Sequence, residues 1–153
     1  MKTKILTALS CLILITMAEG VFADNIISKN DQIILTTRNQ ESGPKVEWIP
    51  SEEQTSIALN AIHDFLRDKK YSGTQNEQRE IILNQISNYR IQFIGILING
   101  RKIIHCNFFP KQDRFEYAKD EYVFVFDGGT SYWRIDYDIE NNMCLNFEVN
   151  GDA

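Results

Sequence analysis

The feature that most constrains the fold is the stretch 89–109, YRIQFIGILINGRKIIHCNFF, in which two apolar runs flank Asn99-Gly100. An Asn-Gly pair supplies the two residues of positive φ that a type I′ turn requires, and the twist of that turn matches the twist of the flanking strands. We therefore predict a β-hairpin that bends at Asn99. The predicted register pairs Ile98 with Arg101, Ile96 with Ile103, Ile94 with His105 and Phe93 with Cys106.

Shorter runs follow the hairpin and are separated by turn residues. They span 122–126, 132–138 and 144–149, with Asp127-Gly128-Gly129 and Glu140-Asn141-Asn142 between them. Runs of this length, rich in β-branched and aromatic residues, are typical of strands. We predict a four- to five-stranded antiparallel meander over about 89–149. Strict alternation gives an inward set of Trp133, Ile135, Tyr137, Leu145 and Phe147, and it places Cys144 on the opposite face.

Two helices are predicted before the hairpin. Ser51-Glu52-Glu53-Gln54 is a capping box that opens a main helix over about 51–68. At about 100° per residue its apolar residues fall in one broad arc, and they are Ile57, Ala58, Leu59, Ala61, Ile62, Phe65 and Leu66. Thr74-Gln75-Asn76-Glu77 is interpreted as a second capping box, which opens a shorter helix over about 75–87. The sheet is the only predicted surface large enough to cover the arc, so the fold class is α+β.

Both faces of the predicted hairpin are apolar, although a strand with one solvated face should alternate. One face carries Ile94, Ile96, Ile98 and Ile103. The N-terminal arm, the second helix or another chain must cover this face, and a homodimer through these four residues is one possibility. Gly95 interrupts the first strand, which indicates a bulge or the close approach of another backbone.

The first 23 residues have the composition of an export signal. Lys2 and Lys4 precede an apolar stretch at 5–18, and Val21-Phe22-Ala23 ends in a small residue that suits cleavage. The stretch is shorter than the roughly 20 residues that a spanning helix needs. We expect a cleaved signal peptide at 1–23, an arm or linker at 24–47 and one α+β domain at 48–153, in a secreted or periplasmic bacterial protein.

The charge of the chain restricts its partners. The formal net charge is −5, and no run of Lys or Arg exceeds two residues. A surface of this kind argues against nucleic acid as a partner and, after signal cleavage, against an anionic membrane.

No catalytic constellation, metal motif or cofactor motif stands out. His63 and His105 are the only histidines, they lie on different predicted elements, and neither HExxH nor CxxC is present. His105 cannot pair with its neighbour Cys106, because adjacent strand residues point to opposite faces. Export would place Cys106 and Cys144 in an oxidising compartment, whereas strand parity separates them, so the sequence leaves a disulfide open.

Aromatic residues are dense in the second half of the chain. Tyr132 and Arg134 lie with Asp136 on the predicted wet face of a strand, and the preceding loop contains Phe115 and Tyr117. Aromatic side chains combined with arginine are typical of protein contact surfaces. The predicted partner-contact residues are therefore Tyr132, Arg134, Asp136, Phe115 and Tyr117.

The order of apolar runs from Ser51 to Val149 resembles the cystatin-like architecture, a helix packed on an antiparallel meander, which also covers many small exported bacterial proteins. In cystatins a Gln-x-Val-x-Gly hairpin enters the protease cleft. Here Gln92-Phe93-Ile94-Gly95 is one residue shorter and lies within a predicted strand, so the resemblance does not extend to protease inhibition. The run DGGTSYWRIDYD…NFEVNG is similar to uncharacterised small exported bacterial proteins and implies no function.

From these features we expect an exported, non-enzymatic binding module that binds another protein in an inhibitor or immunity-type role. The alternative is a small-ligand-binding pocket protein or an NTF2-like enzyme, in which helix and curved sheet enclose a cavity. That alternative needs polar groups inside, and Tyr137 is the only plausible one in the predicted inward set. A deep pocket containing His105 or Asp136 would favour it.

Overall fold

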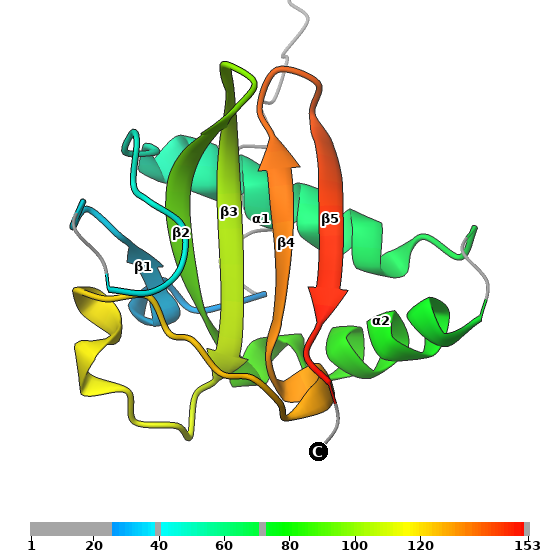
Figure 1. Cartoon of the computed structure of the whole chain (residues 1–153). Helices are drawn as coiled ribbons and strands as arrows, with labels where there is room; N and C mark the ends of the chain where they lie inside the picture. The colour runs from blue at the N-terminus through cyan, green and yellow to red at the C-terminus, as the bar shows by residue number, and fades with distance from the viewer. Residues whose placement is uncertain (1–25, 39–40, 71–72, 152–153) are drawn as a thin grey trace, which may run out of the picture.

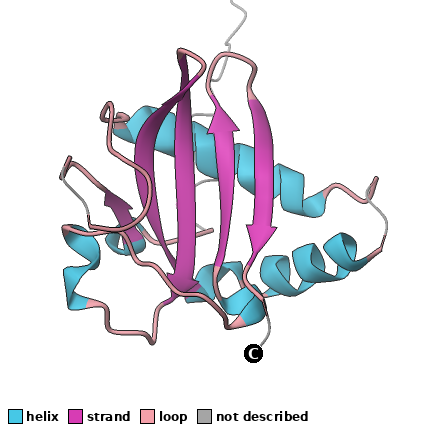
Figure 2. Cartoon of the chain, viewed as in Figure 1, coloured by secondary structure: helices cyan, strands magenta, loops and turns pink. Residues whose placement is uncertain are grey.

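The protein has an α+β fold built on a five-stranded mixed sheet (Figure 1). The computed structural model describes residues 26–38, 41–70 and 73–151; the predicted signal peptide at 1–23 lies outside them. The strands are β1 (Gln32–Ile34), β2 (Tyr89–Ile98), β3 (Arg101–Pro110), β4 (Trp133–Asp138) and β5 (Met143–Val149), in that order across the sheet. Helix α1 (Glu52–Arg67) crosses behind the sheet, and α2 (Thr74–Asn84) packs beside α1 (Figure 2).

The antiparallel meander is confirmed for β2 to β5, and the predicted register of the β2–β3 hairpin is confirmed at all four pairs. Asn99 and Gly100 have φ of 51° and 80°, as the turn requires. The sheet is not entirely antiparallel, because β1, from the N-terminal arm, joins β2 in parallel.

Helix α1 begins as predicted. The Ser51 hydroxyl accepts a hydrogen bond from the Gln54 backbone at 3.2 Å, and the Gln54 side chain accepts one from the Ser51 backbone at 2.9 Å. Ile62 is fully buried against the sheet, but Ile57 is 47% exposed. Ile57 lies about 140° around the helix from Ile62, so the predicted apolar arc was too broad.

The start of α2 differs from the prediction. Gly73, with φ of 81°, is the N-cap, and no side chain caps this helix. Thr74 already lies inside the helix, so its hydroxyl is not where an N-cap group would be, and the predicted second capping box is wrong. The helix ends at Asn84, and a 3₁₀ turn at Ile86–Asn88 leads into β2.

Aromatic side chains fill the space between the helices and the sheet. The rings of Phe108 and Trp133 stack with their centroids 3.6 Å apart, and Tyr89 packs edge-on to Trp133 at 5.9 Å. Trp133, Ile135 and Tyr137 are buried there, as predicted. This helix-facing layer is called the inner core.

A bulge overturns part of the predicted pattern in β5. Asp136 pairs with Leu145, whereas Arg134 pairs with Glu148, so β5 contains one more residue than β4 in this interval. Asn146, with a φ of 51°, lies within it. Since an extra residue reverses the alternation of side chains, Cys144 and Phe147 both pack on the inner core, and Leu145 faces the other side with Asp136. The predicted faces of Cys144 and Leu145 are therefore wrong.

The two cysteines in the described residues are free thiols. Although Cys106 and Cys144 share a face, β4 lies between their strands. Two interstrand spacings separate their backbones by about 10 Å, and a disulfide requires Cα atoms within about 7 Å.

The second apolar face of the hairpin is covered from within the chain. Ile94 and Ile103 are fully buried. Ile94 belongs to a second apolar cluster, which includes Ile33, Leu35 and Val46 of the N-terminal arm and side chains of residues 111–128. We call residues 111–128 the outer segment. Figure 1 shows this segment crossing in front of the sheet, opposite α1. Ile96 and Ile98 are half-buried, so a homodimer through the four isoleucines would require the outer segment or the arm to move.

The close approach predicted at Gly95 is confirmed. The backbone amides of Glu47 and Trp48 both donate to the Gly95 carbonyl, at 2.8 Å and 3.2 Å, and the Trp48 indole donates to the Ile96 carbonyl at 2.9 Å. A Cβ at residue 95 would lie 2.2 Å from the Trp48 carbonyl oxygen. Only glycine allows this contact.

Candidate binding surface

Three of the five predicted contact residues gather on the outer face. The ring centroids of Phe115 and Tyr117 lie 5.6 Å apart, and Phe115 and Tyr132 both pack on the outer apolar cluster. The Tyr132 hydroxyl donates to the carboxylate of Asp113. Desolvation and this carboxylate raise the pKa of Tyr132 to about 12, so the phenol stays protonated and remains a donor.

The other two predicted contact residues are occupied within the protein. Arg134 forms an ion pair with Glu148 of β5. Asp136 is only 6% exposed, and its carboxylate accepts hydrogen bonds from His105 at 2.7 Å and from Asn146 at 2.8 Å. The structure therefore does not present Asp136 to a partner.

Asp136 belongs to a hydrogen-bonded chain of three side chains, which the sequence analysis did not predict. His105 Nδ1 contacts Asp136, and His105 Nε2 lies 3.1 Å from the Tyr122 hydroxyl. Burial raises the pKa of Tyr122 to about 12, so its phenol stays protonated, and the His105 ring bridges Tyr122 and the carboxylate of Asp136. The only signal for this contact would have been the β3–β4 register, which pairs His105 with Asp136.

The three hydrogen-bonded side chains are the kinds of group that form an acid–base relay, but their surroundings differ from those of a relay. A relay acts on a substrate within hydrogen-bond reach. Tyr122 borders a void of about 10 Å³, which is room for about one water molecule. The arrangement therefore joins β3, β4, β5 and the outer segment, and the void of about 10 Å³ that Tyr122 borders is too small for a substrate.

Side-chain amides attach the outer segment to the sheet. Gln92 and Asn107 face each other on β2 and β3. The Gln92 side chain donates to the carbonyls of Ala118 and Glu121, both at 2.7 Å, and accepts from the Val123 amide at 2.9 Å. Asn107 donates to the Val123 carbonyl at 2.8 Å. Both amides are buried, so these contacts fix the backbone of the segment.

A third amide attaches the end of the segment. Asn150 donates to the carbonyls of Val125 at 2.6 Å and Asp127 at 3.3 Å. Residues 122–126 do not form a strand, so the predicted strand there is wrong. Hydrogen bonds from side-chain amides hold the backbone of this stretch in place of strand pairing. Tyr122 and Val123 are both buried, whereas Phe124 is 46% and Phe126 84% exposed.

Phe124 and Phe126 form an edge-to-face pair with ring centroids 4.8 Å apart. The sequence analysis did not identify either residue as exposed, because an alternating aromatic run next to a sheet is typical of a buried strand. We call Phe124 and Phe126 the aromatic surface; Tyr117, elsewhere on the outer segment, is 41% exposed.

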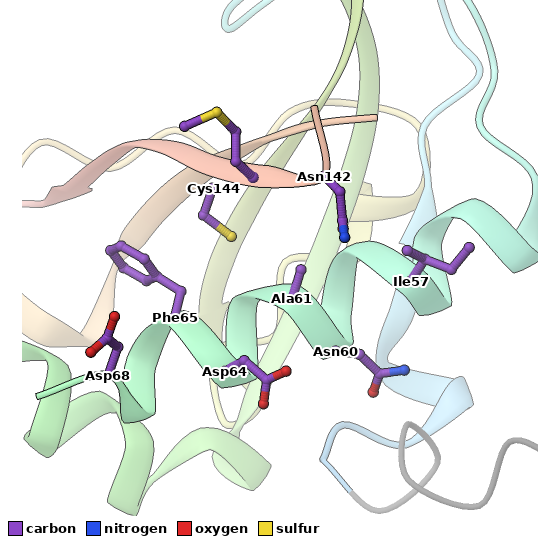
Figure 3. Close-up of a pocket in the computed structure, with 9 residues that line it drawn as sticks. Ile57, Asn60, Ala61, Asp64, Phe65, Asp68, Asn142 and Cys144 are labelled. Carbon is purple, nitrogen blue, oxygen red and sulfur yellow. The ribbon is translucent and has the colours of Figure 1, made fainter. Parts of the chain in front are cut away.

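A groove lies on the other side of the molecule, between α1 and the start of β5 (Figure 3). Its volume is about 570 Å³. It is lined by Ile57, Asn60, Ala61, Asp64, Phe65, Asp68, Asn142, Met143 and Cys144. Burial is the main cause that raises the pKa of Cys144 to about 12, so this thiol is protonated and is a poor nucleophile.

Neither a metal centre nor a membrane span is found in the part of the chain that the structure describes. Within residues 26–38, 41–70 and 73–151, no three side chains of His, Cys, Asp or Glu are grouped to hold a metal ion. No helix in these ranges is long and apolar enough to cross a bilayer. The chain matches no family model, no curated protein and no solved structure.

Proposed function

We propose that this protein is an exported, non-enzymatic binding module that recognises another protein through its aromatic surface. The observation that carries the proposal is the exposure of Phe124 and Phe126 on a segment whose backbone is held by the side-chain amides of Gln92, Asn107 and Asn150. Aromatic side chains supply most of the binding energy at many interfaces. A segment that is already ordered loses little conformational entropy on binding.

The surroundings of the aromatic surface suit an interface. Tyr132 and Arg134 lie near Phe124, around the same small void that Tyr122 borders, and the charges of Arg134 and Glu148 are paired with each other. Interfaces typically combine an apolar centre with a polar rim. A small, exported protein with a rigid aromatic projection suits an inhibitor or immunity-type role, in which the projection enters a cleft of the partner.

The alternative, a small-ligand or NTF2-like pocket protein, has less support. Phe108, Trp133 and Tyr89 occupy the space between helix and sheet where such a pocket would lie. His105 and Asp136 lie on the outer face, in the hydrogen-bonded chain described above. We therefore propose no activity for them.

The test is partner capture from the envelope of the producing cell, with wild type compared to a Phe124→Ser/Phe126→Ser double variant. We expect the variant to lose the partner and to keep the wild-type unfolding midpoint, because exposed rings contribute little to stability. The matched control is Ile49→Ser/Ile81→Ser, which alters side chains that are 53% and 44% exposed elsewhere. Equal capture by all three proteins would contradict the proposal.

A further inference from the structure

The free edge of the sheet lies beside the groove. β5 is the last strand in the sheet order, and within the described residues it pairs with β4 alone. Figure 1 shows β5 as the outermost strand, with α1 passing behind it and extending beyond it. In Figure 3 the first residues of β5 form one wall of the groove and α1 forms the other.

We propose that this groove binds an extended, basic segment of a partner protein, which adds a strand to the edge of β5. An edge strand next to a helix is a known geometry for strand addition: main-chain hydrogen bonds give affinity, and a groove receives alternate side chains. The proposal concerns a surface separate from the aromatic surface and does not depend on the function proposed above.

The bulge limits where a strand can be added. A bulge twists the strand and interrupts the regular row of amides and carbonyls. It lies between the Leu145 and Glu148 pairs, and Asn146 within it has positive φ. The regular part of the edge is therefore 143–145, because Asn142 precedes β5 and has a φ of 49°, and its first two residues border the groove. With so short a ladder, the side chains that enter the groove must contribute much of the recognition.

The lining of the groove defines the chemistry of the bound segment. Ile57 is 47% exposed, and with Ala61 and Phe65 of α1 it gives the groove an apolar part for an inserted aliphatic side chain. The charged lining residues, Asp64 and Asp68, are both acidic and lie one helical turn apart. In an extended segment, basic side chains two residues before and two residues after the apolar one share its face and would reach them.

An acidic segment or a second copy of this chain fits less well. The nearby guanidinium of Arg79 is buried, 4.2 Å from the centre of the Phe65 ring, where it cannot pair with an incoming anion. Two copies joined edge to edge would each have a formal net charge of −5, and like charges oppose such pairing.

The experiment titrates the ¹⁵N-labelled protein with an acetylated octapeptide of threonine that carries lysine at its second and sixth positions and valine at its fourth and eighth, so that lysine and valine share one face of an extended strand. We expect saturable shifts of the amide signals of residues 142–145 and of the α1 residues that line the groove. The same peptide with glutamate in place of both lysines should cause no such shifts. Shifts confined to other residues, or equal binding of both peptides, would overturn the proposal.

Variants separate the groove from the rest of the surface. Asp64→Asn/Asp68→Asn should weaken binding of the lysine peptide about fivefold to tenfold, as expected for the loss of two exposed charge pairs. Glu116→Gln/Asp120→Asn removes the same charge from the outer segment and should leave binding unchanged. The Phe124→Ser/Phe126→Ser variant should also bind the peptide normally, so failure of this proposal is distinguishable from failure of the aromatic surface.

Self-association is measured in parallel by sedimentation without peptide. A monomer supports the proposal. A dimer in which the amides of 143–145 are protected from exchange would show that a second copy occupies the edge, and it would overturn the proposal.

Discussion

The two faces of the sheet are covered in different ways. The inner core is held by apolar contact, with Phe108 stacked on Trp133 and α1 packed across the strands. The outer segment has apolar contacts too, but buried amides of Gln92 and Asn107, with Asn150 near the surface, determine where its backbone lies. Apolar contact is non-directional, whereas hydrogen bonds fix position. The outer face can therefore hold an irregular segment in one conformation and expose its aromatic rings.

The largest expected effect is in the inner core. Trp133→Ala should lower the free energy of unfolding by about 3–5 kcal/mol, because it leaves a cavity beneath the helices at a side chain only 1% exposed. Urea denaturation followed by circular dichroism measures this loss. Phe126→Ala on the outer segment, at 84% exposure, should change the value by about 0.5 kcal/mol or less. Similar losses for both variants would contradict the contrast between the two faces.

The next effect tests the amide contacts. Gln92→Leu should lower the free energy of unfolding by about 3 kcal/mol, because the carbonyls of Ala118 and Glu121 and the amide of Val123 all lose their partner. Hydrogen exchange should accelerate at 118–123 and stay unchanged in α1. The control is Gln75→Leu at an exposed position of α2. An even acceleration of hydrogen exchange through the protein would show that the hydrogen bonds of Gln92 do not act specifically on the outer segment.

A smaller effect is expected where the N-terminal arm meets β2. Gly95→Ala should cost about 2 kcal/mol, since the added Cβ would lie 2.2 Å from the Trp48 carbonyl oxygen and must displace it. Thermal unfolding measures the change. Gly151→Ala, where a Cβ would meet no atom within 4 Å, should be close to neutral. A stable Gly95→Ala variant would show that residues 47–48 move away easily.

The smallest effect is a change in pH dependence at the polar end of β4. Hydrogen bonds from Asn141, followed by the charge of Arg101, hold the pKa of Asp138 below its ordinary value of 3.8, against the opposing effect of desolvation. A lowered native pKa gives stability that is fully present above pH 3.8 and is lost as pH falls through the native pKa. Asp138→Asn should therefore show a shallower decline of the unfolding free energy below pH 3.8. A slope identical to that of wild type would contradict this assignment.

Local sequence signals predicted the elements well. Asn99-Gly100 gave the hairpin and its register, and Ser51 with Gln54 gave the start of α1. These features succeed because the turn and the cap are formed by neighbouring residues. The predicted apolar arc is wrong at Ile57, because the sheet decides how much of the helix surface is covered.

The candidate surfaces were less predictable. Phe115, Tyr117 and Tyr132 were named from the sequence, but Phe124 and Phe126 were assigned to a strand, since alternation alone does not say whether a ladder partner exists. Asp136 was assigned to the surface because its contact with His105 depends on the β3–β4 register. Cys144 lines the groove because the bulge at Asn146 places its side chain on the inner face, and no sequence pattern indicated this bulge.

The sequence by itself determined the β2–β3 hairpin, the main helix, the α+β class and the inward set on β4. The tertiary structure alone decided the parallel pairing of β1, the faces of Cys144 and Leu145, the attachment of the outer segment and the exposure of its phenylalanines. The physical reason is the separation along the sequence between the residues that interact. Turns and caps are satisfied within a few residues, whereas Gln92 finds its partners 26 to 31 residues away, and such contacts exist only once the whole sheet has formed.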